Sequence, residues 1–164
     1  MQKRIGVIFV SRRNSLRSIL AEACLAHLDP QRFSASSCGQ PGHVAREFHP
    51  AAIGALHSAS MPVPQHAPRG WDDLARSGSP QADFIITLDG TTESRQPSWP
   101  GQPDGALWAY PDVADGSDPE KVAHDAIQLL FSLRRRLELL VSLPLHGGDR
   151  AAVRSDVRDL GYMR

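Results

Sequence analysis

Residues 11 to 18 combine the side chains and the setting that bind a small anion. They read Ser-Arg-Arg-Asn-Ser-Leu-Arg-Ser and lie between an apolar run at 5–10 and a helical pattern that begins near Leu16. A loop between a strand and a helix aims several backbone N–H groups at one point, where the helix dipole adds about half a positive charge. A guanidinium and serine hydroxyls add further donors. The expected anion-binding residues are Arg12, Arg13, Asn14, Ser15, Leu16, Arg17 and Ser18.

The same arginines also admit a plainer interpretation, in which Arg12, Arg13 and Arg17 are solvated charges near the start of a helix. Positive charge in that place is unfavourable by about 0.3–1 kcal/mol. Three arginines there therefore need a reason, and a bound anion is one. The segment is not a Walker-type phosphate loop, because the sequence contains no Gly-x4-Gly-Lys-Ser/Thr pattern.

Length and composition indicate one globular domain without a strong electrostatic field. The chain has 164 residues, a hydrophobic fraction of 41% and a formal net charge of zero. A neutral chain has no general attraction for nucleic acid or an anionic membrane, and its apolar stretches are shorter than the roughly 20 residues that span a bilayer. Only Cys24 and Cys38 occur, so a disulfide framework is not expected. These features predict a cytoplasmic protein.

Apolar periodicity places the strands and helices that hold this loop. The expected strands are 5–10, 33–38, 83–88 and 106–110. The expected helices are 16–28, 51–56 beginning near Pro50, a long one from Ser117 to Pro144, and a short one through Val153, Val157 and Leu160 with a stop at Gly161. Ser117 and Glu120 have the spacing of a capping box. Residues 58–80 are expected to be irregular, apart from one short helix at 71–75.

Strands that alternate with helices predict a parallel sheet with crossover helices on both faces. In such sheets ligands lie at the carboxyl ends of the strands. We therefore expect the loops after Val10, Leu88 and Tyr110 to converge on one site. Trp99 and Trp108 are expected either at its rim or in the core, and we favour packing for Trp108.

The order of residues around the loop resembles a known family. The segment Val7-Ile8-Phe9-Val10-Ser11-x-x-Asn14-Ser15-x-Arg17-Ser18-x-x-Ala21-Glu22 is similar to the signature of low-molecular-weight protein tyrosine phosphatases and the related thioredoxin-coupled arsenate reductases, a Cys followed after five residues by Arg-Ser. The further segments that resemble this family are Pro50–Leu56, Asp83–Leu88, Pro97–Gly101, Trp108–Asp112 and Leu143–Leu145. Together they cover most of residues 4–145.

This resemblance implies an α/β fold, a three-layer sandwich around a four-stranded parallel sheet of Rossmann-like form. It implies a bacterial-type phosphatase/arsenate-reductase-like domain at 1–145. Residues 146–164 would then be a C-terminal extension, expected as a short helix packed on the same domain. The implied ligand is phosphate, arsenate or a sulfate-like anion, or a phosphorylated molecule, with no metal, cofactor, nucleic acid or membrane partner. Nothing in the sequence indicates an oligomeric state.

The departures from the family pattern concern its reactive groups. Ser11 stands where the family has its nucleophilic Cys, and a serine hydroxyl is a weak nucleophile without an adjacent base. Arg13 stands where the family has a small residue. An ungapped alignment over 86–101 places Asp89 and Gln96 at the two further cysteines of arsenate reductases. We therefore expect a pseudo-enzyme that retains the oxyanion-binding loop and lacks thiol chemistry.

Asp112 falls at the general-acid position of the family, where an Asp protonates the leaving group and later activates water. The catalytic positions are thus Ser11, Arg17 and Asp112. Two alternatives remain open. The first is a phosphatase-like hydrolase that uses Ser11 or a water activated by Asp112, or an arsenate-related enzyme with an altered mechanism. The second is a non-catalytic interaction module that contacts a partner through 58–80 or 146–164.

Other polar clusters have plainer interpretations. None of the seven histidines forms an i, i+4 pair with an adjacent Glu, and no Cys/His cluster occurs, so surface or capping roles are expected rather than a metal site. Arg134, Arg135 and Arg136 are expected on a solvated face of the long helix. Cys24 is expected to be a buried packing residue.

Overall fold

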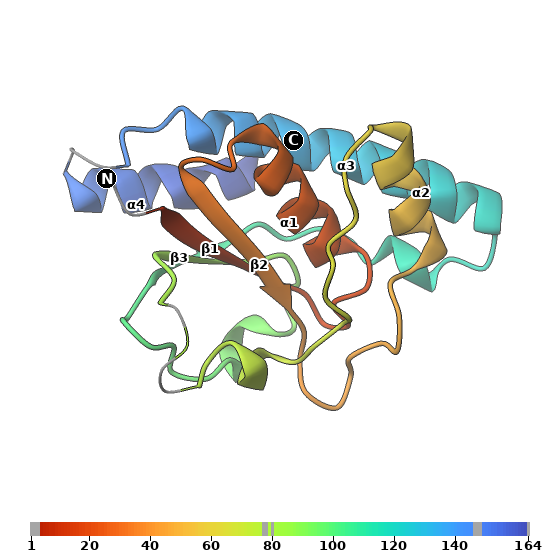
Figure 1. The fold of residues 1–164 in the computed structure, drawn as a ribbon, viewed down its shortest axis with the longest axis horizontal. Coiled ribbons are helices and arrows are strands. Elements are labelled where there is room, and N and C mark those ends of the chain that lie inside the picture. Colours follow the sequence, from red (N-terminus) through yellow and green to blue (C-terminus); the bar gives the residue numbers. More distant parts are fainter. Residues whose placement is uncertain (1–3, 77–78, 80, 146–148, 164) are drawn as a thin grey trace.

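A four-stranded parallel sheet forms the centre of the molecule (Figure 1). The computed structural model describes residues 4–76, 79, 81–145 and 149–163. The strands are β1 (Ile5–Val10), β2 (Phe33–Cys38), β3 (Phe84–Thr87) and β4 (Asp104–Leu107), and they lie in the order β2-β1-β3-β4. In this register Val7 lies beside Ala35 on one side and Phe84 on the other. The predicted Rossmann-like α/β fold is confirmed.

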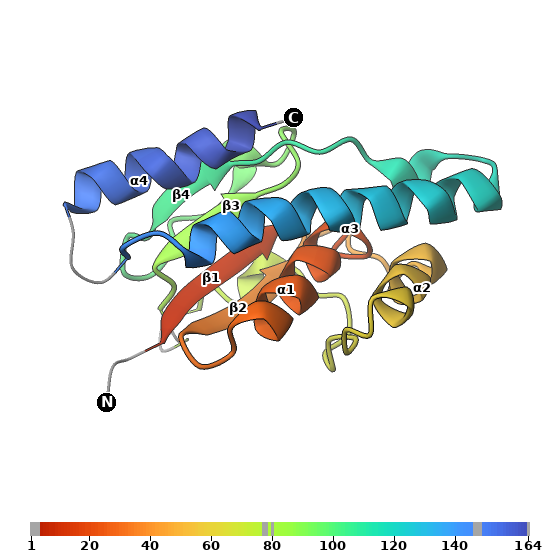
Figure 2. The same cartoon turned by 90° about the horizontal axis from the view of Figure 1, so that it is seen from above.

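All the α-helices of the described residues lie on one face of this sheet (Figure 2). They are α1 (Arg17–Leu28), α2 (Pro50–Ser58), α3 (Pro119–Val141) and α4 (Arg150–Asp159). Helices α1 and α3 lie across the strands, α4 follows β4, and α2 packs against α1 and α3 beyond the sheet. The predicted apolar stripe of α3 is buried and consists of Val122, Ala126, Leu129, Leu130, Leu133, Leu137 and Leu140.

Alternation along the strands divides the core in two. Val7, Phe9 and Ile86 belong to the large cluster under the helices. Ile8 and Ile85 belong to a smaller cluster on the opposite face. Since successive side chains of a strand point to opposite faces, the continuous apolar run of β1 is explained by burial on both sides.

The second face of the sheet is covered by irregular chain and 3-10 turns, so the prediction of crossover helices on both faces is wrong. In its described residues, the connection from α2 to β3 carries one 3-10 turn, η1 (Trp71–Asp73), in place of a helix. Pro62, Pro64 and Pro68 lie in this connection. Proline has no N–H and clashes with the preceding helical turn, so this segment covers the sheet without forming a helix.

Two predicted boundaries are also wrong. Strand β4 ends at Leu107 rather than at 110, and the predicted strand start at 106 lies two residues inside it. The cap of α3 is Asp118 rather than Ser117, because the Asp118 carboxylate accepts the N–H of Glu120 at 3.0 Å and Pro119 begins the helix. Proline suits the first helical position, since its missing N–H would have no partner there.

The C-terminal segment packs on the edge of the sheet at β4. Val153 and Val157 of α4 are buried, and the buried indole N–H of Trp108 donates to the Val157 carbonyl at 2.9 Å. A final 3-10 turn, η4 (Leu160–Tyr162), follows α4. The expected start of the extension at 146 and its glycines at 147 and 148 lie outside the described residues.

Arg136 is not on a solvated face, contrary to the prediction for 134–136. It is 5% exposed, its guanidinium lies 4.5 Å above the ring of Tyr110, and one terminal nitrogen donates to the Met163 carbonyl at 2.6 Å. The stripe that contains Leu133 and Leu137 includes Arg136, since three residues advance a helix by almost one turn. Within the described residues, no helix has the length and apolarity that a bilayer span requires.

Candidate functional site

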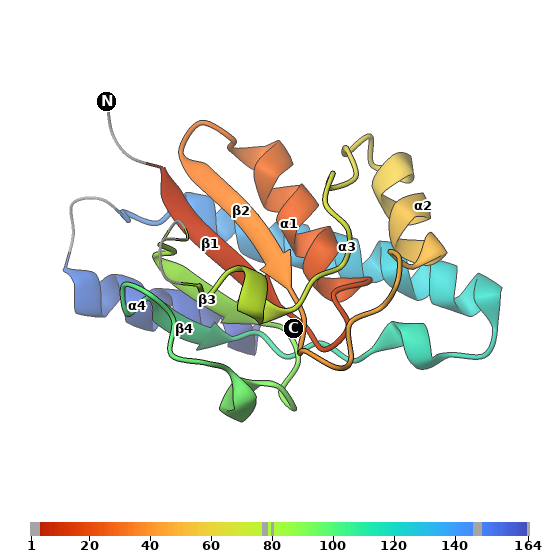
Figure 3. The same cartoon turned by 60° about the horizontal axis from the view of Figure 1, so that its bottom comes forward.

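The carbonyl groups of the 11–18 loop face the chain that follows β2. Those of Arg12, Arg13 and Ser15 accept backbone N–H groups from residues 40–49, at 2.9, 3.0 and 2.9 Å. Figure 3 shows these two loops side by side beyond the carboxyl ends of the strands. Backbone hydrogen bonds from residues 40–49 to these carbonyl oxygens therefore fix the position of the loop.

The N–H group of Ser11 donates to the Cys38 carbonyl at 3.2 Å, but the N–H groups that follow it in the loop are different. Among the described residues, no oxygen accepts a backbone hydrogen bond from residues 12 to 17. In a planar trans peptide the N–H points opposite to the preceding carbonyl. The N–H groups of Arg13, Asn14 and Leu16 consequently point away from residues 40–49. A set of free donors at the start of a helix is the arrangement that binds anions.

Close backbone contact fixes the loop against β2. A Cβ atom added to Gly39 would lie 2.9 Å from the Arg12 carbonyl oxygen and 3.1 Å from the backbone nitrogen of Asn14. Asn14 itself has a left-handed backbone, with φ of 52°. Asn tolerates this conformation better than most residues. Gly39 and Asn14 therefore both allow the sharp turn of the loop in which its carbonyls face residues 40–49.

A buried chain of hydrogen bonds supports the loop from below. The hydroxyl of Ser11 donates to that of Ser18 at 2.7 Å. The Asn14 amide donates to Ser18 and to Ser37 of β2, both at 2.8 Å. Asn14 and Ser18 are fully buried, and Ser11 is 2% exposed. These side chains therefore hold the loop together, and the Ser11 hydroxyl has another hydroxyl, rather than a base, as its partner.

This chain ends on an ion pair between α1 and the irregular connection. Ser37 donates to the Glu22 carboxylate at 2.5 Å, and the same carboxylate lies 2.7 Å from Nε2 of His66. The hydrogen bond with Glu22 raises the pKa of His66, although partial burial acts in the opposite direction. His66 thus links residues 58–80 to the support of the loop.

Arg17 joins three strand-end loops, as the sequence predicted. Its guanidinium donates to the carboxylate of Asp89, after β3, at 2.7 Å and to the carbonyl of Tyr110, after β4, at 2.9 Å. A carboxylate oxygen of Asp112 lies 3.7 Å away. Arg17 is only 5% exposed, so these partners fix its orientation at the start of α1.

The carboxylate of Asp89 lies within the site, next to the guanidinium of Arg17. Burial acts to raise its pKa, but hydrogen bonds from the hydroxyl and N–H of Thr91 and the charge of Arg17 outweigh burial, so the pKa of Asp89 lies below its ordinary value. Asp89 therefore stays ionised and compensates Arg17.

The remaining predicted residues lie around the mouth of the site. Asp112 caps the 3-10 turn η3 (Val113–Asp115) by accepting the N–H of Ala114 at 3.2 Å. Arg13 points outward and pairs with Asp115 at 3.2 Å. Ser15 and Leu16 are buried, and Leu16 belongs to the core. Leu16 thus offers its backbone alone, while Arg13 borders the site.

Other reactive groups lie away from this loop. Burial raises the pKa of both Cys24 and Cys38 to about 12, which keeps these thiols protonated. In the part of the chain that the structure describes, no group of three or more His, Cys, Asp or Glu side chains has the arrangement of a metal site.

Sequence reasoning missed the residues that support the loop from outside it. Ser37 lies in β2, Gly39 directly follows this strand, and His66 lies in the irregular connection from α2 to β3. Glu22 was included only as part of a motif. Their spacing carries no signal, because a hydrogen-bond chain between distant segments leaves no periodic pattern.

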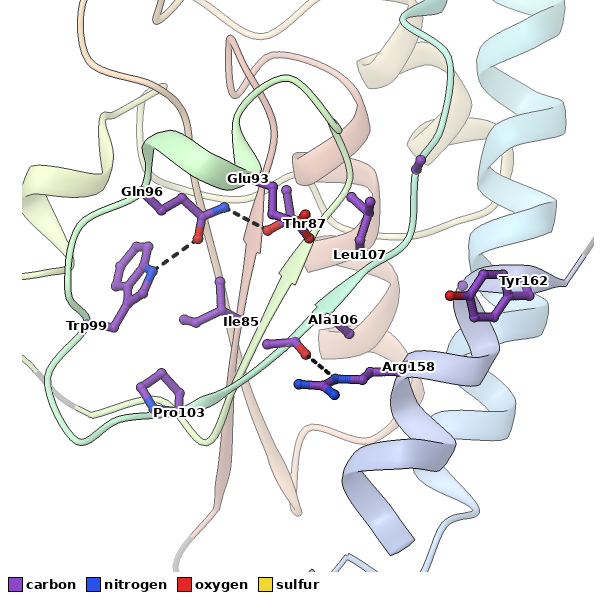
Figure 4. Close-up of a pocket in the computed structure, with 13 residues that line it drawn as sticks. Ile85, Thr87, Glu93, Gln96, Trp99, Pro103, Ala106, Leu107, Arg158 and Tyr162 are labelled. Carbon is purple, nitrogen blue, oxygen red and sulfur yellow. Dashed lines mark hydrogen bonds between the residues drawn. The ribbon is translucent and has the colours of Figure 1, made fainter. Parts of the chain in front are cut away.

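A second cavity of about 720 Å³ lies over β3 and β4 on the face without helices (Figure 4). Its wall includes Trp99, whose indole donates to Gln96, while the Gln96 amide donates to Thr87. On the other side Arg158 of α4 donates to the Gly105 carbonyl. Trp99 therefore lines this cavity rather than the 11–18 loop, and Trp108 is packed in the core at 0% exposure, as favoured.

The family model of low molecular weight phosphotyrosine protein phosphatases matches residues 6–104 of the chain. No curated protein matches the chain.

Several solved structures share the fold. A thioredoxin-dependent arsenate reductase of Corynebacterium glutamicum is 22% identical, with a TM-score of 0.58, and the match covers 84% of this chain and 64% of that enzyme. An arsenate reductase in a phosphate binding state is 23% identical over 84% of this chain and 97% of that one, with a TM-score of 0.66. A tyrosine phosphatase of Erwinia amylovora is 18% identical over 85% and 93%, also with a TM-score of 0.66.

The contact at Gly39 predicts a clear effect on stability. Gly39→Ala should lower the free energy of unfolding by about 1–3 kcal/mol, because the new Cβ meets backbone that cannot yield. Gly54→Ala is the matched control. It lies in α2 with open space around it and should stabilise by about 0.5–1 kcal/mol. Urea unfolding measures both, and equal effects of the two substitutions would contradict the close contact.

The raised pKa of His66 predicts a pH dependence of stability. Protonated His66 stabilises the fold fully below its unfolded pKa of about 6.5. This contribution is lost as the pH rises through the raised pKa of the folded state. His66→Gln should therefore flatten the decline in unfolding free energy above about pH 6.5, whereas His57→Gln, at an exposed position of α2, should not. Identical pH profiles for the two variants would rule out the Glu22 pair as the cause.

Proposed function

This chain belongs to the low molecular weight phosphotyrosine protein phosphatase family, and from that premise we propose that its 11–18 loop binds phosphate, arsenate or a phosphorylated ligand with weak or no turnover. The observation that carries the proposal is the orientation of the loop. The carbonyls of Arg12, Arg13 and Ser15 are bonded to residues 40–49, and within the described residues the N–H groups of residues 12–17 have no acceptor. The guanidinium of Arg17, at the start of α1, is held by Asp89. One solved relative is an arsenate reductase in a phosphate binding state.

Weak or absent turnover follows from the group at the nucleophile position. The family signature places a thiol where this chain has Ser11. The Ser11 hydroxyl donates to Ser18, and a hydroxyl cannot serve as its general base. Neither thiol can substitute for the missing one, because Cys24 and Cys38 are buried and protonated. The proposal is therefore a pseudo-enzyme that binds an oxyanion.

A hydrolase that uses water is the second candidate, and Asp112 is the observation in its favour. One carboxylate oxygen lies 3.7 Å from Arg17, and the side chain is 22% exposed at the mouth of the site. A carboxylate in this place can accept a proton from an attacking water. In that case Asp112→Asn would abolish hydrolysis and Ser11→Ala would not.

We further propose that residues 1–145 form the family domain and that 146–164 are an extension of it. The packing of α4 along β4 and the bond from Trp108 to Val157 support an extension that packs on the same domain. A cytoplasmic location belongs to the same proposal, and the two buried, unpaired cysteines accord with a reducing compartment.

Binding of inorganic phosphate tests the proposal. Calorimetric titration of the wild type should show one site, and Arg17→Lys should weaken binding by about tenfold or more, because an ammonium lacks the planar fork. Arg17→Lys keeps the buried charge opposite Asp89 and so protects the fold. Arg76→Ala, an exposed arginine of an i, i+3 pair, is the control and should bind as the wild type does. Absence of binding at millimolar phosphate, or equal binding by Arg17→Lys, would refute the proposal.

Restoring the thiol tests whether only the nucleophile is missing. Ser11→Cys should raise hydrolysis of para-nitrophenyl phosphate at least about tenfold above the wild type, since a thiolate at this position is a far better nucleophile. Ser11→Ala is the control and should stay at the wild-type level. If Ser11→Cys is no faster than Ser11→Ala, the loop does not hold the ester for attack.

A further inference from the structure

A polar hollow of about 360 Å³ lies beside the 11–18 loop and is separate from the cavity over β3 and β4. Its lining residues are Arg12, Gln40, His43, Thr91 and Arg95. They come from the loop itself, from the segment after β2 and from the segment after β3. Three of the five are Arg or His, and none is a carboxylate, although the whole chain carries no net charge.

Arg12 differs from the other two arginines of the loop. Arg13 pairs with Asp115, and Arg17 pairs with Asp89. Arg12 has no carboxylate partner among the described residues. Instead, one terminal nitrogen of its guanidinium lies 3.5 Å from Nδ1 of His43. The exposed guanidinium of Arg12 is thus turned toward the hollow with its charge uncompensated.

Arg95 also lines this hollow, and its guanidinium also lacks a carboxylate partner among the described residues. It ends the 3-10 turn η2 (Glu93–Arg95), is exposed and forms no ion pair within the described ranges. The nearby carboxylate of Glu93 lines the other cavity instead. Two uncompensated guanidinium groups around one hollow repel each other, and an anion between them removes that repulsion.

A series of hydrogen bonds connects the hollow to the 11–18 loop. Thr92 donates its N–H and its hydroxyl to the Asp89 carbonyl, at 3.2 and 2.9 Å, and the N–H of Arg95 bonds to Thr92. The carboxylate of Asp89 in turn holds Arg17. One short segment therefore positions both Arg95 and the guanidinium of the loop.

We propose that this hollow binds a second anionic group of the ligand whose phosphate lies in the 11–18 loop. The ligand class is a phosphomonoester that also carries a carboxylate or a second phosphate. Arginine recognises both groups with its planar fork, and the Gln40 amide adds a donor. This inference rests on the proposed function, because it places the first anionic group in the loop.

The test compares two phosphomonoesters of similar size, glycerol 3-phosphate and 3-phosphoglycerate, which differ by one carboxylate. Calorimetric titration of the wild type at constant ionic strength should show about tenfold tighter binding of 3-phosphoglycerate, as expected for one charge-assisted contact. Arg95→Ala should remove most of this preference, while the control Arg76→Ala should retain it. A phosphotyrosine peptide flanked by Asp, compared with the same peptide flanked by Asn, tells whether the second group can be a protein side chain.

The outcomes separate this inference from the proposed function. If inorganic phosphate binds but neither the two esters nor the two peptides differ in affinity, the inference is overturned and the proposed function stands. A preference that survives Arg95→Ala also overturns it. If neither ester nor inorganic phosphate binds, both fail together. An Arg95-dependent preference in either ligand pair supports the second anion site and identifies its source.

Discussion

The buried guanidinium of Arg17 is the interaction on which the site depends. Arg17 is the first residue of α1, and its guanidinium bonds to Asp89 in the segment after β3 and to the carbonyl of Tyr110 in the segment after β4. A buried charge without partners costs several kcal/mol, and removal of one partner leaves that cost uncompensated. The Arg17–Asp89 pair therefore holds the loop after β1 against the segment after β3. Any arrangement that separated the two side chains would leave two buried charges unpaired.

The same pairing decides how the site attracts an anion. Arg17 has Asp89 at 2.7 Å and Asp112 at 3.7 Å, so these three side chains together carry one negative charge. Attraction for a phosphate must then come largely from the free backbone N–H groups of residues 12–17 and the dipole of α1. The outward bonding of the loop carbonyls to residues 40–49 is therefore as important to the proposed function as the arginine.

Sequence patterns predicted the parts of this structure that depend on local periodicity. Strands β1 and β2, the start of α1 and the buried stripe of α3 follow from apolar spacing and turn residues. The convergence of the three loops follows from the rule that parallel strands end at one edge. The irregular path of residues 58–80 was predicted, but not that this segment covers the second face of the sheet in place of a helix, because the face that a connection covers depends on its tertiary contacts.

The hydrogen-bond chain beneath the 11–18 loop could not be predicted from the sequence for a related reason. Asn14, Ser37, Glu22 and His66 form one hydrogen-bond chain, yet they lie in four segments whose spacing shows no repeat. The resemblance to a phosphatase signature included Asn14 and Glu22 but not their partners. Arg136 was assigned to solvent because charged runs usually are, whereas Tyr110 and the Met163 carbonyl bury it.

The central claim is that the free N–H groups of the 11–18 loop receive an oxyanion. Amide NMR spectra of the 15N-labelled chain during titration with inorganic phosphate test this claim most directly. The account predicts that the N–H resonances of Arg13, Asn14 and Leu16 move most and saturate together, while that of Gly54 in α2 stays fixed. Saturating shifts that bypass these three amides, or no shifts at millimolar phosphate, would contradict it.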